Sequence, residues 1–370
     1  MLTFFFANNY KSLVNFRVEF DRTNVLIGRN GSGKSAVLGL LASLQQFILG
    51  RGRTTDYFST NTLTRWMKSS VQTFEFGVKV NDKEYVYHLE LEYNLPAGQC
   101  LVALESVVCS GKKLFSSAKG EVSYLANDAT QSSMLRVDRA FSGISYVANG
   151  IQDNEVLVFM NEVAKIVFCS INPRKMQDHV SSEAWLPDLE FSNIGSVFSF
   201  LAQANPDAIT HLRDQLRQID PSLERLKIKM GYGNWKSLIA EYRYHDYPVE
   251  FCLSELSEGE RMVIALYILL FGYLREGHTV FIDEPDNYVS LREIQPWCIA
   301  GADACVDGGQ CIAISHHPEV IDYFGNDNVI WISRLNSGES EIKKKPDSEQ
   351  FKDFMKLSEL ITGGFLDENE

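Results

Sequence analysis

The feature that most constrains this chain is the glycine-rich segment at residues 28–35, which reads Gly-Arg-Asn-Gly-Ser-Gly-Lys-Ser. It fits the pattern G-x-x-x-x-G-K-[ST], in which backbone N–H groups turn inward around a phosphate chain. An apolar run precedes it at residues 23–27, and apolar residues at helical spacing follow over residues 36–48. A chance glycine loop that caps a helix is the alternative. The order of strand, loop and helix favours a nucleoside triphosphate site.

Within this segment, the phosphate contacts are expected from the backbone and from one cation. Lys34 is expected to reach the β- and γ-phosphates of the nucleotide, and the Ser35 hydroxyl to bind Mg²⁺. The other residues expected to bind the nucleotide are Asn30, Gly31, Ser32 and Gly33. A nucleoside triphosphate and Mg²⁺ are therefore the expected ligands, and the family resemblance described below implies that the nucleotide is ATP.

Composition places the chain among ordinary globular proteins. Its 370 residues are 45% hydrophobic and 22% charged, which suffices for one large domain or two. The net charge of −13 supplies no overall basic field, so contact with DNA or RNA requires a local patch or a partner. The seven cysteines are scattered and form no C-x-x-C pair, which favours buried free thiols over disulfides or zinc.

Two apolar stretches bear on localisation. Residues 1–6 lack the basic lead of a signal peptide, and the run at residues 262–274 is too short to span a bilayer. The second run suits a buried helix. We therefore expect a cytoplasmic protein without membrane contact.

The first part of the chain alternates apolar and polar residues as antiparallel strands do. The pattern predicts two strands in residues 1–20 and a hairpin over residues 74–93 with its turn at 81–84. Further short strands are expected up to Leu125. The polar residues 51–60 are expected to form a loop.

The middle of the chain has the periodicity of mixed helices and strands. The expected helices cover residues 154–165, 194–204 and 206–219, the last two with Asn193 and Asn205 at their starts. The expected strands cover residues 166–171, 226–230 and 238–242.

A second anion-binding helix end is predicted at residues 256–260, which read Leu-Ser-Glu-Gly-Glu. Here Ser257 and Gly259 would place a hydroxyl and free N–H groups at the positive end of the following helix. The alternative is a plain N-cap followed by acidic first-turn residues.

Two further apolar runs end in polar side chains. Residues 279–282 lead into two carboxylates: Asp283 would hold Mg²⁺, and Glu284 would polarise the attacking water. Residues 310–315 lead into His316, which would contact the γ-phosphate. Solvated acids and a surface histidine are the alternatives, but the ordered series of motifs favours a catalytic site.

Taken in order, these motifs resemble those of ABC-type ATPases of the RecF, SMC and overcoming-lysogenization-defect kind. The resemblance is greatest to compact prokaryotic AAA-family ATPases that lack a long coiled coil. The motifs are Walker A at residues 28–35, the ABC signature at 256–260, Walker B at 280–284 and the switch histidine at 314–316. The resemblance implies an α/β fold: a P-loop ABC-ATPase head with a mostly parallel core sheet, an N-terminal antiparallel β-lobe and a helical subdomain.

The resemblance also implies a single ABC-type ATPase domain over residues 1–370. Its expected parts are an inserted antiparallel β-lobe at 70–150, a helical subdomain at 153–225, the signature, Walker B and switch half of the core at 248–335, and a C-terminal helix and tail at 346–370.

In such proteins two heads enclose two ATP molecules, which implies a homodimer that forms around ATP. Ser257 and Gly259 would then act in trans on the γ-phosphate bound by the other subunit. The family implies Mg²⁺-dependent hydrolysis to ADP and phosphate, and the extra acids Glu258 and Glu260 predict that it is slow. Residues 286–291, which follow Walker B, depart from the family pattern. Whether the two ATP sites of the expected dimer communicate therefore stays open.

The implied role is a molecular switch that regulates a separate effector or a nucleic-acid-processing partner, in anti-phage defence or DNA repair. The chain contains no D-x-D pair for a nuclease metal site, so a nuclease or toxin is expected to be a separate protein. Direct binding of nucleic acid stays open. The alternative function is the ATPase subunit of a membrane transporter, which the long insertion and the lack of a clear Q-loop disfavour.

Overall fold

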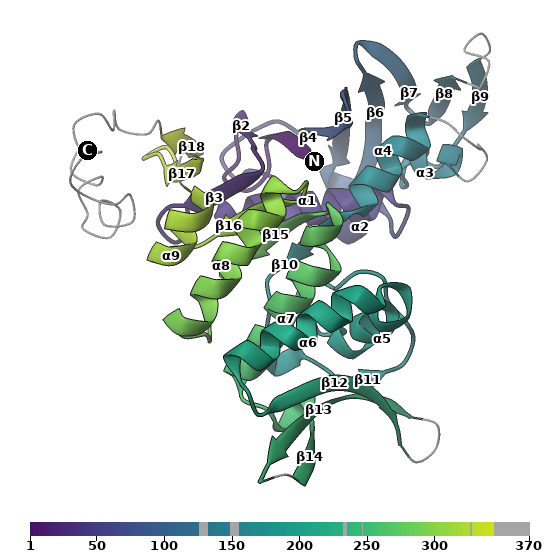
Figure 1. Cartoon of the computed structure of the whole chain (residues 1–370). Coiled ribbons are helices and arrows are strands. Elements are labelled where there is room, and N and C mark those ends of the chain that lie inside the picture. The colour runs from purple at the N-terminus through teal and green to yellow at the C-terminus, as the bar shows by residue number, and fades with distance from the viewer. Residues whose placement is uncertain (126–131, 149–154, 232–234, 246, 326–327, 344–370) are drawn as a thin grey trace. The chain divides into compact units, whose positions relative to one another are not determined.

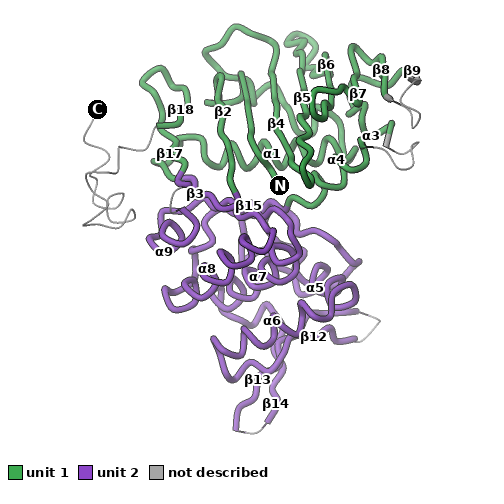
Figure 2. The backbone as a smooth tube through the Cα atoms, turned by 45° about the horizontal axis from the view of Figure 1, so that its top comes forward, with its two compact units in different colours: residues 1–21, 27–166, 330–344 green, residues 22–26, 167–329, 345–370 purple. Residues whose placement is uncertain are grey.

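The computed structural model describes residues 1–125, 132–148, 155–231, 235–245, 247–325 and 328–343. The chain divides into two compact units (Figure 2). The first comprises Met1–Asp21, Ile27–Ile166 and the segment that begins at Ile330, and the second comprises Arg22–Leu26 and Val167–Val329. Each unit therefore combines segments that lie far apart in the sequence.

The first unit is built on an antiparallel sheet of eight strands in the order β2-β1-β4-β5-β6-β7-β8-β9 (Figure 1). Polar and apolar residues alternate along β5, and its burial alternates in the same way, because successive side chains point to opposite faces of a sheet. The strands expected between residues 74 and 125 are present. The strand bounds are Leu2–Asn8 (β1), Phe16–Glu19 (β2), Val71–Val80 (β4), Lys83–Asn94 (β5), Gln99–Cys109 (β6), Lys112–Ala118 (β7), Glu121–Leu125 (β8) and Ser132–Arg136 (β9).

The hairpin of β4 and β5 turns more tightly than predicted. Val80 pairs with Lys83, so only Asn81 and Asp82 connect the two strands, and Asn81 has a φ of 53°. The predicted turn at residues 81–84 is therefore wrong at its second half. Charged residues at the start of β5 look like turn residues in the sequence, but backbone pairing continues through them.

Helices and a short hairpin complete the first unit. They are α1 (Lys34–Ile48), α2 (Thr54–Tyr57), α3 (Gly143–Ala148), α4 (Glu155–Ala164), and the antiparallel strands β17 (Val329–Arg334) and β18 (Ser340–Lys343). The loop predicted at residues 51–60 is wrong in part, because it contains α2. The buried Thr54 hydroxyl donates to the carbonyl of Cys100 at 2.5 Å, which holds this polar segment against β6.

The second unit has buried strands at its centre in the order β10-β15-β16-β3, and β15, β16 and β3 run parallel. Asp283 pairs with Ile314, and Ile314 pairs with Leu26, so the carboxyl ends of these three strands are level. Nearly all their residues are buried, as expected for strands covered on both faces. The bounds are Ile166–Cys169 (β10), Thr279–Asp283 (β15), Gln310–Ile314 (β16) and Thr23–Ile27 (β3).

The second unit also contains helices and a small separate antiparallel sheet. The helices are α5 (Ile194–Ala204), α6 (Pro206–Ile219), α7 (Glu258–Gly272), α8 (Leu291–Val306) and α9 (Pro318–Val320). The small sheet contains β11 (His179–Val180), β12 (Leu223–Met230), β13 (Lys236–Tyr244) and β14 (Tyr247–Cys252). Residues 262–272 of α7 are all buried, as predicted, because α6 and α8 both pack against this helix.

The two asparagines predicted to cap helices behave differently. Asn205 accepts a hydrogen bond from the Ala208 N–H at 3.1 Å and caps α6 as predicted. Asn193 precedes α5 but does not cap it, so that prediction is wrong. Its side chain instead accepts from the Asp188 N–H at 3.0 Å and donates to the Leu186 carbonyl at 3.0 Å, which stabilises the preceding loop.

All seven cysteines are free thiols, and six of them are buried, as predicted. Burial raises the pKa of Cys100 to about 11 and that of Cys305 to about 12, which keeps these thiols neutral. No helix in the described part of the chain combines the length and apolar composition of a membrane span. The helix expected at residues 346–370 lies outside the described residues. The expected organisation as one domain stays a prediction.

Glu105 is a fully buried carboxyl group in the first unit. It accepts hydrogen bonds from the Tyr87 hydroxyl at 2.9 Å, the Ser142 hydroxyl at 2.6 Å and the Gly143 N–H at 2.6 Å. Burial nevertheless raises its pKa above the usual value of 4.5, because a charged carboxylate loses its hydration there.

This raised pKa predicts a pH dependence of stability. The folded protein retains a proton that an unfolded glutamate releases, so the free energy of unfolding falls as the pH rises from 4.5 towards the folded-state pKa. Glu105→Gln cannot ionise and is expected to lose this part of the pH dependence. Urea unfolding of both proteins from acidic to neutral pH measures it, with Glu19→Gln at an exposed site as the control. Identical pH profiles for Glu105→Gln and the wild type would contradict the prediction.

Candidate nucleotide-binding site

The loop at residues 28–35 follows β3 directly and leads into α1 (Figure 1). Gly28, Gly31 and Gly33 have φ values of 143°, 81° and 116°, which residues with a side chain rarely adopt. A Cβ atom on Gly28 would lie 2.0 Å from the carbonyl oxygen of Ile332, and one on Gly33 would lie 2.6 Å from the Ser340 hydroxyl. The loop therefore requires glycine at all three positions for its conformation, and at Gly28 and Gly33 for its packing as well.

The loop holds one buried cation and one buried hydroxyl. The Lys34 side chain donates to the carbonyls of Gly28 and Arg29, the second at 3.3 Å, so its ammonium lies against the loop backbone. The Ser32 hydroxyl is buried and has no hydrogen-bond partner among the described residues. A buried donor without a partner is costly, and a phosphate oxygen would satisfy it. The first turn of α1 has no acidic residue to compete with an anion at its N-terminus.

Two serines that the sequence analysis did not identify support this loop. The Ser340 hydroxyl donates to the carbonyl of Ser32 at 2.6 Å and accepts from the hydroxyl of Ser12 at 2.7 Å. The Ser340 N–H donates to the carbonyl of Ser12 at 2.8 Å. Ser340 lies 308 residues from Ser32 in the chain, so no local sequence pattern could have indicated this contact.

In the second unit, the predicted catalytic acids lie at the end of β15. Asp283 is half-buried and pairs with Ile314, while Glu284 is exposed. The Glu284 N–H donates to the Ile314 carbonyl at 2.8 Å, and its carboxylate accepts from the Asn287 amide at 2.5 Å. Glu284 has a φ of 50°, an uncommon conformation that turns the chain sharply at the strand end.

The neighbouring strand β16 ends in a second hydrogen-bonded turn. The Ser315 hydroxyl donates to Asp286 at 2.5 Å and accepts from the His317 N–H at 2.9 Å. His316 lies between these two anchored residues, and its side chain is exposed. Asp286, which the sequence analysis treated only as a departure from the family pattern, thus connects the segments that follow β15 and β16.

The predicted signature residues begin α7 with reciprocal hydrogen bonds. The Ser257 hydroxyl accepts from the Glu260 N–H at 3.2 Å, and the Glu260 carboxylate accepts from the Ser257 N–H at 2.8 Å. Glu258 forms an ion pair with Arg174 at 2.8 Å. The plain N-cap considered as an alternative is therefore present in the structure, and both acids have local partners. A cap does not exclude phosphate contact, because the Ser257 hydroxyl still has a proton to donate.

Gly259 connects this helix end to the segment after Walker B. A Cβ atom at Gly259 would lie 2.9 Å from the carbonyl oxygen of Tyr288, which itself has a φ of 68°. Arg261 holds the same region through bonds to the carbonyls of Leu256 and Pro173, at 2.8 Å and 2.9 Å. Sequence analysis did not identify Arg261, because an arginine in the first turns of a helix has no distinctive pattern.

The described residues contain no cluster of three or more histidine, cysteine or acidic side chains arranged for a metal ion. This fits Mg²⁺ bound together with a nucleotide, because Mg²⁺ then takes few protein ligands and completes its shell with phosphate and water. The sequence predicts Ser35 and Asp283 as the oxygen ligands of Mg²⁺, and this assignment stays a prediction.

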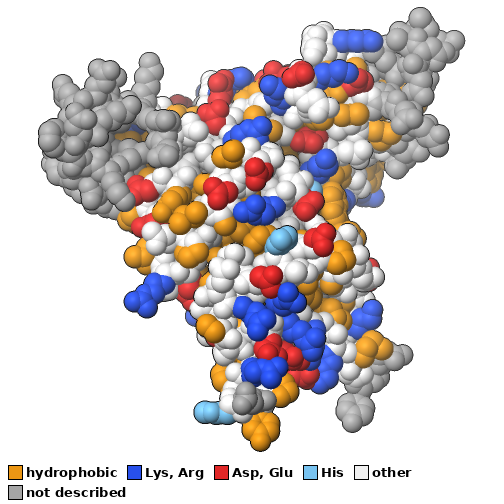
Figure 3. Space-filling model, viewed as in Figure 1, with side chains coloured by type: hydrophobic (Ala, Val, Ile, Leu, Met, Phe, Trp, Pro, Cys, Tyr) orange, Lys and Arg blue, Asp and Glu red, His pale blue; other side chains and the backbone are white. Residues whose placement is uncertain are grey.

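Basic side chains on the small sheet of the second unit are paired with acids. Lys227 contacts Glu250 at 2.8 Å, and Arg225 contacts Glu241 at 3.1 Å. Figure 3 shows acidic and basic side chains interspersed where Figure 1 places β12–β14. This region therefore lacks the single-sign basic surface that binding to a nucleic-acid backbone favours.

Comparison with known proteins identifies the class of fold. Residues 176–322 match a family model described as "AAA domain, putative AbiEii toxin, Type IV TA system". The chain is similar to an SMC head bound to the C-winged helix domain of ScpA, with 14% identity, a TM-score of 0.57, and coverage of 95% of this chain and 99% of that one. It is also similar to an SMC head domain with an extended coiled coil bound to the C-terminal domain of ScpA derived from Pyrococcus furiosus, with 12% identity, a TM-score of 0.53, and coverage of 95% and 98%. No curated protein matches the chain.

These findings confirm the predicted α/β fold of an ABC-type ATPase head. The fold is similar to that of SMC head domains, and the AAA family model matches residues 176–322, in agreement with the predicted resemblance.

The position of Ser340 predicts a specific effect on the phosphate loop. Ser340→Ala removes a hydrogen bond to the loop backbone, which is typically worth about 1 kcal/mol, so we expect the Kd for ATP to rise about fivefold. Equilibrium titration with a fluorescent ATP analogue measures the change. Ser337→Ala, at an exposed position near the same strand, is the control and is expected to bind like the wild type. Unchanged affinity in Ser340→Ala would show that the loop does not depend on this contact.

Proposed function

We propose that this protein binds ATP at the loop of residues 28–35 and hydrolyses it with Mg²⁺. One observation carries the proposal: three glycines with positive φ, a buried lysine cation and a buried hydroxyl without a partner are gathered in one loop at a helix N-terminus. This combination suits a phosphate chain, because it supplies inward N–H groups, positive charge and one more donor.

Each predicted site residue takes a role in this proposal. Lys34 binds the β- and γ-phosphates, assisted by the loop residues Asn30, Gly31, Ser32 and Gly33. Magnesium is bound by Ser35 and Asp283, Glu284 activates water, and His316 contacts the γ-phosphate.

Strand register supports this assignment. Asp283, Ile314 and Leu26 are level in the parallel strands of the second unit, and the loop begins at Gly28, two residues after Leu26. Ligands in open α/β sheets typically bind beyond the carboxyl ends of such strands.

We further propose that two copies of the chain close around two ATP molecules, with Ser257 and Gly259 completing the site of the partner subunit. The exposed position of Ser257 at the α7 N-terminus supports this arrangement, because a partner subunit could reach it. In the sequence this helix end lies far from the glycine loop at residues 28–35. The ion pair of Glu258 with Arg174 offsets part of the negative charge that such a contact would bring close to a triphosphate.

The dimer would act as a switch for a separate effector in anti-phage defence or DNA repair. Two similarities support a protein partner: the matched family model describes a toxin of a toxin–antitoxin system, and the similar SMC heads are bound to domains of ScpA. The acidic net charge of −13 also favours a protein partner over direct contact with nucleic acid.

Lys34→Ala is expected to abolish ATP binding, because it removes the cation that is proposed to bind the β- and γ-phosphates. Calorimetric titration with ATP and Mg²⁺ tests this. Lys68→Ala, an exposed lysine of the same unit, should bind ATP normally. Wild-type affinity in Lys34→Ala would refute the proposed site.

Glu284→Gln is expected to keep ATP bound and to accumulate as a dimer, because it removes the base that activates water and preserves the side-chain shape. Light scattering coupled to size-exclusion chromatography with ATP and Mg²⁺ would then report twice the mass of the monomer. The double variant Lys34→Ala/Glu284→Gln is the control and should remain monomeric. A monomeric Glu284→Gln protein with ATP bound would overturn the dimer proposal.

A further inference from the structure

The hairpin of β17 and β18 packs against the glycine-rich loop within the first unit (Figure 2). The backbone carbonyl of Ile332 on β17 lies so close to Gly28 that no Cβ atom fits between them. On β18, the Ser340 hydroxyl donates to the Ser32 carbonyl at 2.6 Å. The loop therefore has a wall formed by a segment from the far end of the chain.

Arg334, the last residue of β17, lies on the face of the hairpin that carries Ser340. The two residues pair directly, and directly opposite residues of an antiparallel pair point to the same face of the sheet. The Arg334 Nη1 atom lies 4.0 Å from the position of a Cβ atom built on Gly31. The guanidinium group thus lies beside the middle of the loop.

The guanidinium group is oriented by the hairpin but is not neutralised by it. Its Nε atom donates to the carbonyl of Gly338 at 3.0 Å, which is the one hydrogen bond that Arg334 makes among the described residues. Nη1 and Nη2 keep their N–H donors, and the side chain is exposed. These donors are available to a ligand of the loop.

The turn that binds Nε is itself held in place. Gly338 has a φ of 96°, and a Cβ atom at this position would lie 3.1 Å from the Trp66 ring. The Gly338 N–H donates to the Leu335 carbonyl at 2.8 Å, and the Leu335 N–H donates to the Glu339 carbonyl at 2.8 Å. The turn therefore presents the guanidinium in one orientation, which lowers the entropy cost of binding.

Phosphate is the chemical group that fits this position. A guanidinium group carries a permanent positive charge, and the geometry of its donors matches phosphate oxygens. The buried Ser32 hydroxyl, which has no partner among the described residues, independently indicates a ligand at the same loop. Lys34 already donates to two loop carbonyls, and its single charge balances only part of a triphosphate.

We propose that Arg334 is a second cation of the nucleotide site and binds the phosphate chain held by the loop. This inference rests on the proposed function and adds to it a residue that lies far from the loop in the sequence. Lys34 and Arg334 would approach the phosphates from separate elements, α1 and β17.

The test is calorimetric titration of the full chain with ATP and Mg²⁺ at several concentrations of KCl. Arg334→Gln is expected to raise the Kd for ATP about tenfold, because it removes a charge-assisted contact with phosphate. Salt screens such contacts, so the Kd of Arg334→Gln is also expected to rise less steeply with KCl concentration than that of the wild type.

Two further variants separate charge from structure. Arg334→Lys keeps the positive charge and is expected to bind ATP more tightly than Arg334→Gln, with a salt dependence close to that of the wild type. Arg136→Gln removes the same charge at an exposed position on β9 of the first unit, and it should bind ATP like the wild type at every salt concentration.

Wild-type affinity in Arg334→Gln would overturn the inference. Weaker binding with an unchanged salt dependence would overturn it as well, because it would assign Arg334 to the nucleoside or to support of the loop. Either result leaves the proposed ATP site intact, since Lys34→Ala tests that site separately. Failure of the wild type to bind ATP would refute both the proposed site and the inference.

Discussion

The parallel pairing of β3, β16 and β15 is the constraint on which the candidate site depends. Leu26, Ile314 and Asp283 are level in this pairing, although Leu26 lies far from the other two in the sequence. Each strand is followed directly by a segment with candidate functional residues: β3 by the glycine loop, β16 by the turn that contains Ser315, and β15 by Glu284. Because the side-chain period of a strand is two, a slip of one residue would turn each of these strand ends to the opposite face.

Close backbone packing is the second requirement, and glycine meets it at two places. A Cβ atom at Gly28 would collide with the backbone carbonyl of Ile332 in the same chain. A Cβ atom at Gly259 would come close to the carbonyl of Tyr288. In the first case the space is needed for the tight turn of the glycine loop. In the second case the absence of a side chain lets the α7 N-terminus pack against the segment that follows Walker B. A shift of either segment would therefore displace the other.

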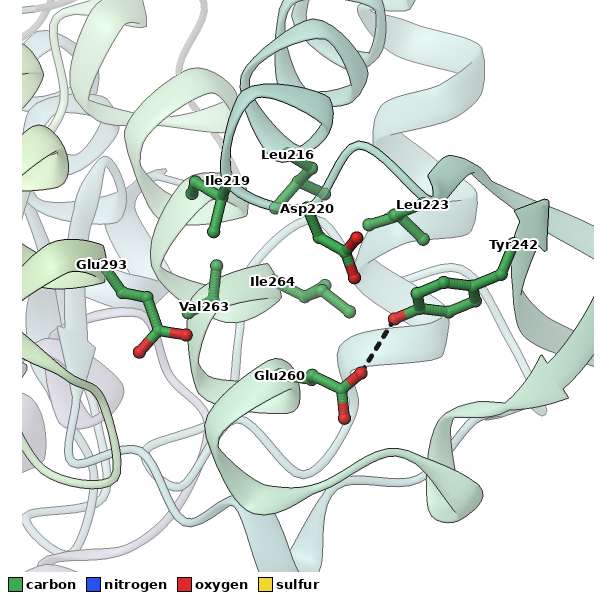
Figure 4. A pocket seen from close by; sticks show the side chains of 9 residues that line it. All are labelled: Leu216, Ile219, Asp220, Leu223, Tyr242, Glu260, Val263, Ile264 and Glu293. Carbon is green, nitrogen blue, oxygen red and sulfur yellow. Dashed lines mark hydrogen bonds between the residues drawn. The ribbon is translucent and has the colours of Figure 1, made fainter. Parts of the chain in front are cut away.

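Glu260 shows how one residue can link two features of a fold. Sequence analysis treated it as an extra negative charge near a triphosphate, with slow hydrolysis as the consequence. In the structure its carboxylate receives the Ser257 N–H and the Tyr242 hydroxyl, and it lines a cavity together with Asp220 and Glu293 (Figure 4). The charge is therefore directed largely into the second unit, which weakens the argument for slow hydrolysis.

The sequence by itself determined the motif order, the type of most long elements and the strand ends at which polar residues follow, because local patterns of glycine, hydrophobic period and capping encode these. It did not predict the 16-residue helix α8. It misassigned residues 51–60, the turn at 81–84 and the role of Asn193, where a single tertiary contact or continued strand pairing overrides local preference. Only the tertiary structure decided that Ser12 and Ser340 support the phosphate loop and that Asp220, Glu260 and Glu293 face one cavity. Such contacts join segments that share no sequence periodicity, and only the packing of distant elements brings them together.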